Sequence, residues 1–182
     1  LNITYSSGNA TIATFDGVSG AGDINITGAN GGRTYNFTGD ISDWTGTLTQ
    51  TATSGSMNLN ISGTSALNGS IENTATGSAC NITGNLKADM TVGGQINYTS
   101  AGPVNVNVGD SSNKVAVNFT NTVKAGSVNV VNNSTATFQN NVTATTLYQK
   151  GGTINIGDAD HHVVVNTERV EAGDSNTGTD SS

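Results

Sequence analysis

The sequence predicts an all-β protein, a parallel β-solenoid resembling a right-handed β-helix, with rungs of about 22 residues. Three observations support this prediction. Short segments alternate apolar and polar residues, the segments recur at a nearly constant spacing, and the three- and four-residue apolar intervals of a helix are missing. β-Branched residues are also abundant, while good helix formers are sparse.

Each alternating segment is interpreted as a half-buried strand, with apolar side chains turned inward and Asn or Thr outward. The clearest segments cover residues 23–27, 35–38, 57–61, 104–108, 115–119 and 153–156. Glycines between the segments, including the pairs Gly31-Gly32, Gly93-Gly94 and Gly151-Gly152, are typical of turns. The chain is therefore expected to consist of short strands joined by tight connections.

The strands recur with a step of about eleven residues, so that two or three of them would make one rung. The stretch from about Gly84 to Gly102 breaks the step, which indicates a loop or a change of rung shape. The regular step is clearest at the apolar positions Phe15, Ile26, Phe37, Leu48 and Leu59.

An antiparallel β-sandwich is the alternative, because it also produces short strands at even spacing. The solenoid is favoured because the same residue types recur at the same phase, and because outward Asn and Thr side chains could form a stacked ladder. We expect the repeat domain to cover residues 1–167. Residues 168–182 are polar and are expected to form a flexible tail or linker.

Composition argues against several function classes. The six Lys and Arg residues are scattered and the formal net charge is −7, which argues against nucleic-acid binding. No apolar run reaches transmembrane length, so membrane insertion is not expected. Cys80 is the single cysteine and is expected to pack in the core. No cofactor is predicted.

Three stretches combine alternating Asn, Thr and aliphatic residues with turn glycines: Asn81–Leu86, Ser134–Val142 and Gly151–Gly157. These stretches resemble the passenger repeats of bacterial autotransporter adhesins. The resemblance implies a β-solenoid carried on the cell surface. It transfers no functional residue to this chain.

One segment could bind a metal ion. Asp158, Asp160 and His162 would share a face of an extended strand, and carboxylates with an imidazole can bind a divalent cation. A solvated turn after the strand at residues 154–156 is the competing interpretation. His161 would point to the opposite face.

Asn-x-Ser/Thr sequons are abundant and would be glycosylation sites in a host that modifies them. An alternating strand with outward Asn and Thr also generates this pattern without any modification. The acceptor positions are Asn2, Asn9, Asn25, Asn36, Asn60, Asn68, Asn81, Asn97, Asn118, Asn132, Asn133 and Asn141.

The function expected from these features is that of a non-enzymatic extracellular structural or adhesive protein of the cell surface, which self-associates into a filament, stalk or array. The first alternative is a carbohydrate-binding or carbohydrate-active module, in which Trp44 stacks on a host or environmental glycan beside Tyr35 and Tyr98. The second is an ice-binding protein, suggested by repeated Thr-x-Thr pairs such as Thr47–Thr49 and Thr143–Thr145.

Overall fold

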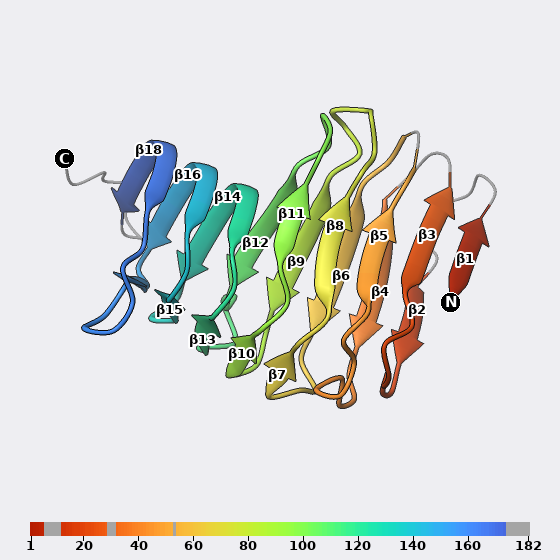
Figure 1. The fold of residues 1–182 in the computed structure, drawn as a ribbon, viewed down its shortest axis with the longest axis horizontal. Helices are drawn as coiled ribbons and strands as arrows, with labels where there is room; N and C mark the ends of the chain where they lie inside the picture. Colours follow the sequence, from red (N-terminus) through yellow and green to blue (C-terminus); the bar gives the residue numbers. More distant parts are fainter. Residues whose placement is uncertain (6–11, 29–31, 53, 174–182) are drawn as a thin grey trace.

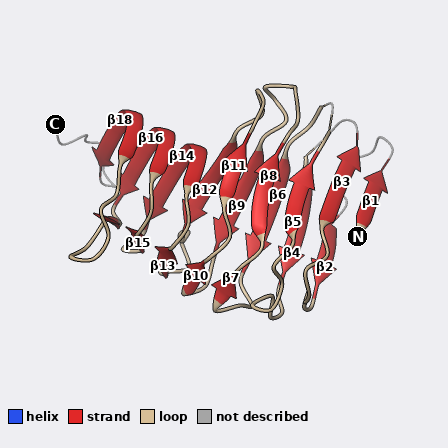
Figure 2. Cartoon of the chain, viewed as in Figure 1, coloured by secondary structure: helices blue, strands red, loops and turns tan. Residues whose placement is uncertain are grey.

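The computed structural model describes residues 1–5, 12–28, 32–52 and 54–173, and contains no helix within them (Figure 2). Parallel strands stack along one axis as a β-solenoid of about seven turns. Partners in adjacent turns are typically 23 residues apart, as in Asn2↔Asn25 and Val142↔Val165. The predicted fold class and a rung close to the predicted length are confirmed.

The solenoid has three faces (Figure 1). The first face contains β1 (Asn2–Tyr5), β3 (Ile24–Gly28), β5 (Thr47–Gln50), β8 (Ser70–Asn73) and β11 (Ile96–Tyr98). The second contains β2 (Ile12–Phe15), β4 (Arg33–Phe37), β6 (Met57–Ile61), β9 (Ile82–Leu86) and β12 (Val104–Val108). The third contains β7 (Ala66–Leu67), β10 (Met90–Val92), β13 (Ala116–Phe119), β15 (Thr135–Phe138) and β17 (Thr153–Ile156).

Three long strands complete the last turns by running through both the first and the second face. They are β14 (Val123–Val131), β16 (Val142–Lys150) and β18 (Val165–Gly173). β14 pairs with β11 at its start and with β12 further along, which joins the two faces into one 13-stranded sheet.

The eleven-residue step is half a turn, because consecutive apolar positions fall alternately on the second and the first face. Phe37 lies on β4, Leu48 on β5 and Leu59 on β6. The stretch that breaks the step contains β10 and β11 and lengthens the turn: Ile96 pairs with Val123, 27 residues later. The break in the step therefore corresponds to a longer turn, in which the third-face strand has three residues in β10 compared with two in β7.

Inward side chains form continuous columns along the axis. One column of the second face runs from Ala13 to Val170 and is interrupted only at Gly84. Its buried members Tyr35, Leu59 and Val106 alternate along their strands with half-buried outward residues. The rings of Phe119 and Phe138 stack with centroids 4.7 Å apart. Cys80 is fully buried, as expected.

Adjacent turns touch so closely at some corners that only glycine fits. A Cβ atom on Gly63 would overlap the carbonyl group of Thr38 in the preceding turn, and one on Gly94 would overlap that of Gly69. These glycines are required by contact between rungs rather than by backbone dihedral angles.

The last strand crosses the domain boundary that the sequence analysis places at residue 167. Residues 168–173 belong to β18 and pair with β16 up to Lys150↔Gly173. Two of its charged residues continue outward rows, since Arg169 pairs with Thr146 and Glu171 pairs with Tyr148. The remainder of the predicted tail, residues 174–182, lies outside the described residues.

Asp110 organises the corner between the second and third faces. Its carboxylate accepts hydrogen bonds from the backbone N–H groups of Ser112 and Asn113, both at 2.8 Å, and lies 3.4 Å from the Nζ of Lys87. The backbone hydrogen bond from Ser112 is the main cause that lowers the pKa of Asp110 to about 2, with further lowering by Asn113 and Lys87.

We therefore expect Asp110→Asn to destabilise the protein at neutral pH but not in strong acid. A carboxylate with a lowered folded-state pKa contributes stability above its unfolded pKa of about 3.9 and loses it as pH falls through the folded pKa. Urea unfolding of both proteins at a series of pH values should show that the difference in their free energies of unfolding shrinks as the pH falls from about 4 to about 2. A difference independent of pH would assign the effect to hydrogen-bond geometry instead of charge.

Candidate functional site

The outer surface of the second face carries an asparagine ladder, formed by Asn36, Asn60, Asn85, Asn107 and Asn129. Each Nδ2 donates to the Oδ1 of the preceding turn, at distances of 2.8, 3.0, 2.8 and 2.8 Å along the series. The register of β4, β6, β9, β12 and β14 places these residues directly above one another. The stacking of outward amides expected from the sequence is confirmed here.

The row beside the asparagine ladder is also uncharged. It consists of Thr34, Asn58, Thr83, Asn105, Ser127 and Thr146, which are aligned by the same strand pairings. In β18 the two rows end on Arg169 and Glu171, whose side chains form an ion pair. The second face thus presents a regular, uncharged hydrogen-bonding surface whose charges lie at one end.

Eleven of the twelve sequon asparagines lie in the described residues, and Asn9 lies outside them. Many have side-chain amides that already make contacts within the fold: Asn60 lies in the ladder, Asn68 donates to the Ser42 carbonyl at 2.7 Å, and Asn132 donates to the Asp110 carbonyl at 2.9 Å. The exposed members are Asn2, Asn25, Asn68, Asn133 and Asn141, and the half-buried members are Asn36, Asn60, Asn81, Asn97, Asn118 and Asn132. Glycosylation of these residues stays a prediction.

The predicted metal residues lie in a turn instead of on one face of a strand. The Oδ1 of Asp158 accepts hydrogen bonds from the backbone N–H groups of Asp160 and His161, both at 2.9 Å, and contacts the His161 Nδ1 at 2.6 Å. The hydrogen bond from the His161 side chain is the largest cause that holds the pKa of Asp158 below its ordinary value. The turn therefore pairs Asp158 with His161, not with His162.

No cluster of three His, Cys, Asp or Glu side chains suited to a metal ion occurs in the described part of the chain, which includes this turn. The grouping of Asp158, Asp160 and His162 assumed an extended backbone. The left-handed conformation of Gly157, with φ of 69°, turns the chain immediately after β17 and removes that geometry.

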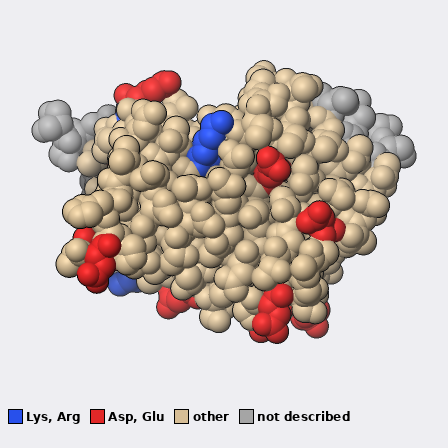
Figure 3. Space-filling model, viewed as in Figure 1, with Lys and Arg blue, Asp and Glu red and all other residues tan. Residues whose placement is uncertain are grey.

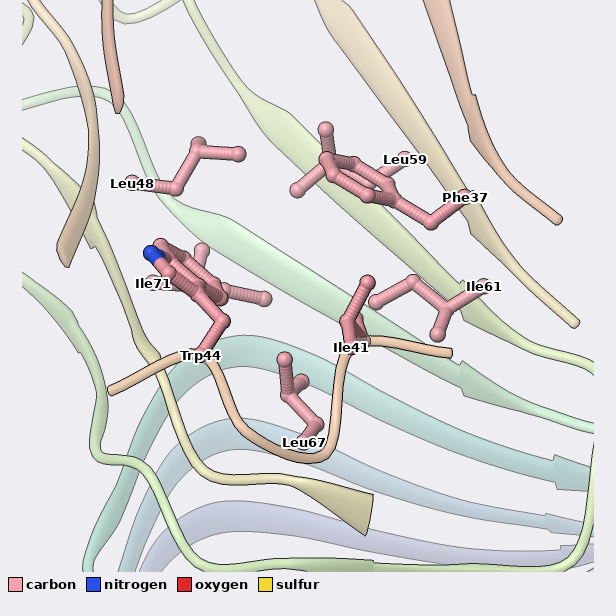
Figure 4. A pocket seen from close by; sticks show the side chains of 8 residues that line it. All are labelled: Phe37, Ile41, Trp44, Leu48, Leu59, Ile61, Leu67 and Ile71. Atoms are coloured by element: carbon pink, nitrogen blue, oxygen red, sulfur yellow. The ribbon is translucent and has the colours of Figure 1, made fainter. Parts of the chain in front are cut away.

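Trp44 is not a surface residue. Its side chain is 1% exposed, and its indole Nε1 donates to the carbonyl of Gly22 at 2.8 Å. The ring packs in the core with Phe37, Ile41, Leu48, Leu59, Ile61, Leu67 and Ile71 around a void of about 10 Å³ (Figure 4). The predicted glycan-stacking role of Trp44 is therefore wrong, and Tyr35, which is 2% exposed, is likewise enclosed.

The Thr-x-Thr pairs do not form one array. Thr47 and Thr49 lie on the first face in β5, Thr135 and Thr137 lie on the third face in β15, and Thr143 returns to the first face in β16. Thr49 is followed in the next turn by Glu72. The surface with the most regular spacing is the asparagine ladder.

The two ends of the stack carry the most exposed apolar side chains. At the C-terminal end, Val170 is 68% exposed and Val164 66%, and Ile156 of β17 is 46% exposed. Val170 and Ile156 continue the columns of Leu147 and Phe138, which are buried in the preceding turn. Among the described residues, no further turn covers these side chains.

Comparison with known proteins gives no match: no protein-family model fits the chain, and no similar curated protein or solved structure was found. No helix among the described residues is long and apolar enough to span a membrane.

Proposed function

We propose that this chain is a non-enzymatic structural or adhesive protein of the extracellular cell surface, comparable in role to autotransporter passenger repeats, and that copies of it stack end to end. The observation that carries the proposal is the last described turn, in which interior columns reach the surface at Val170 and Ile156.

β18, the last described strand, supports this mode of association in two ways. The outer edge of β18 presents backbone N–H and C=O groups that can pair with another strand, as every inner strand of the stack does. The exposed Val170 of this strand would gain the burial that equivalent residues have in inner turns. Backbone pairing and apolar burial are therefore both satisfied by one more parallel turn.

The opposite end of the same chain has complementary columns. The column that ends at Val170 begins at Ala13, and the first-face column that ends at Val165 passes through Val142 and Val123. In a second copy stacked in the same direction, Ala13 would lie over Val170 of the first copy and continue its column. Such a head-to-tail contact does not close on itself, so it generates a filament.

We expect Val170→Lys to abolish assembly without unfolding the protein, because the side chain is already exposed and the added charge would be buried only in the stacked state. Sedimentation velocity over a concentration series, with electron microscopy of the same samples, measures the effect. Asn155→Lys, at an exposed outward position of β17, is the matched control and should assemble like the unmodified protein.

Assembly by the Val170→Lys variant at the same concentrations would contradict end-to-end stacking. An unmodified protein that stays monomeric throughout the series would also contradict it.

A further inference from the structure

A surface hollow lies at the corner between the first and second faces in the last turns. It is lined by Tyr98 of β11, by Thr143, Ala144 and Thr145 of β16, and by Asn166 and Glu168 of β18. Its volume is about 140 Å³, roughly ten times what a single water molecule requires. The hollow shares β18 with the exposed end, but its lining includes neither Val170 nor a residue of the asparagine ladder.

The hollow results from a change in how successive turns take this corner. In earlier turns a loop joins the two faces, such as residues 74–81 between β8 and β9 and residues 99–103 between β11 and β12. In β14, β16 and β18 the corner is a bend within one strand, and the register omits Thr145 and Glu168 at that bend. Figure 1 shows the loops rising above β8–β12 and the surface dropping toward β14.

The loops therefore form a ledge beside the lower surface of the last turns. Figure 3 shows the notch on this edge of the molecule, with a basic side chain in it. The Ala144 side chain is buried, and the neighbouring Thr143 and Thr145 are exposed. Tyr98 lies at the foot of the ledge, immediately before the loop at residues 99–103.

The lining combines hydrogen-bonding groups of several kinds around one aromatic ring. Thr143 and Thr145 carry hydroxyl groups that both donate and accept, Asn166 offers an amide, and Glu168 offers a carboxylate. The Nζ of Lys124 lies 4.6 Å from the centre of the Tyr98 ring and donates to the Tyr98 carbonyl at 2.8 Å. A positive charge therefore stands beside Tyr98, and the lining contains one carboxylate.

This set of groups fits a neutral, hydroxyl-rich ring better than an ion. A divalent cation needs more oxygen ligands of negative charge and no adjacent ammonium group. An anion would meet the Glu168 carboxylate. A sugar ring can donate to the carboxylate, exchange hydrogen bonds with the threonines and Asn166, and place C–H groups against Tyr98.

We propose that the corner hollow binds one pyranose unit of a neutral glycan, which would give the proposed surface protein a specific ligand. The site includes Tyr98, which sequence analysis associated with a glycan site, and it excludes Trp44 and Tyr35. Glu168 joins it because β18 runs through the segment predicted to be a tail.

The test is a titration of the isotope-labelled protein with the methyl glycosides of glucose, galactose and mannose and with N-acetylglucosamine. Binding is detected by changes in the amide NMR shifts. At least one sugar should give saturable shifts confined to Tyr98, residues 143–145 and residues 166–168. Affinity in the millimolar range is expected because one ring offers few atoms for contact.

Two conservative variants locate the site. Glu168→Gln and Thr145→Val should each weaken binding about tenfold, since each removes a hydrogen-bonding partner. Thr137→Val, on the third face, is the matched control and should bind unchanged. Because Thr145 and Glu168 are exposed, these variants are expected to keep the spectrum of the folded protein.

The absence of saturable shifts with all four sugars would overturn the proposal. Shifts centred on another face, or unchanged affinity in both variants, would overturn it as well. The outcome is independent of end-to-end assembly, because Val170→Lys alters the stacking surface and leaves the lining residues in place.

Discussion

Replacing Trp44 with alanine should lower the free energy of unfolding by about 3–5 kcal/mol, the range for large aromatic-to-alanine changes in protein cores. The side chain is enclosed by residues from three successive turns and from more than one face. Its removal would enlarge the existing void and leave the Gly22 carbonyl without the indole hydrogen bond. The effect is expected to spread along the stack, because each turn is stabilised mainly by its neighbours.

Urea unfolding, monitored by circular dichroism, measures this loss. Trp44→Phe is the informative companion variant, because it keeps most of the apolar volume and removes the N–H donor. It should cost much less than the alanine variant, on the order of 1–2 kcal/mol. A loss below about 1 kcal/mol for Trp44→Ala would contradict the buried position of this side chain.

The misplacement of Trp44 shows where sequence patterns lose information. Asp40 and Asp43 precede it in the sequence, and such a polar setting is typical of an exposed turn. In the structure the Asp40 carboxylate accepts hydrogen bonds from the Ser42 N–H and the Thr64 hydroxyl, while the tryptophan ring turns into the core. In an irregular turn, apolar and polar residues do not alternate, so the sequence does not indicate which side chains point inward. Burial of a side chain there depends on the neighbouring turns of the solenoid.

The first and second faces could be predicted because most of their strands have at least four residues and alternate clearly. Their half-turns are also nearly equal in length, so apolar positions such as Leu48 and Leu59 recur at a constant step. The third face starts with strands of two and three residues, β7 and β10, which are too short to show a period. These strands pair because neighbouring turns hold them side by side, and their local sequence does not predict the pairing.

Of the two candidate sites, the asparagine ladder could be predicted from the sequence and the corner hollow could not. The asparagine ladder follows directly from alternation and register, so the sequence shows it. The corner hollow depends on the difference between a loop in one turn and a bend in the next, and its residues are separated by up to 70 positions, from Tyr98 to Glu168. No local motif marks such a site, although the break in the eleven-residue step identifies the region beside it.

Asn73 is expected to be the most sensitive polar residue of the fold. Its side chain is fully buried, its Nδ2 donates to the carbonyls of Cys80 and Pro103 at 2.6 and 3.3 Å, and its Oδ1 accepts from the Ala75 N–H at 3.0 Å. These bonds tie the corner loop of one turn to that of the next. Asn73→Ala should destabilise the protein by about 3 kcal/mol, because buried backbone groups would lose their partners in a site that excludes water.

Asn155→Ala is the matched control, since Asn155 is exposed and makes one long hydrogen bond of 3.3 Å to Thr137. It should change stability by no more than about 0.5 kcal/mol. Urea unfolding compares the two variants, and equal effects would contradict the role assigned to Asn73. Amide hydrogen exchange should also speed up at Gly102, whose N–H donates to the Ala75 carbonyl between the two loops.

The same variant connects the corner loops with the glycan site. Asn73 pairs in register with Tyr98, which lines the hollow at the foot of the loop that Asn73 holds through Pro103. Loosening that loop should weaken sugar binding although Asn73 does not line the hollow, and the Asn155→Ala control should leave binding intact. Unchanged affinity in a folded Asn73→Ala protein would show that Tyr98 and β16–β18 position the sugar without the ledge.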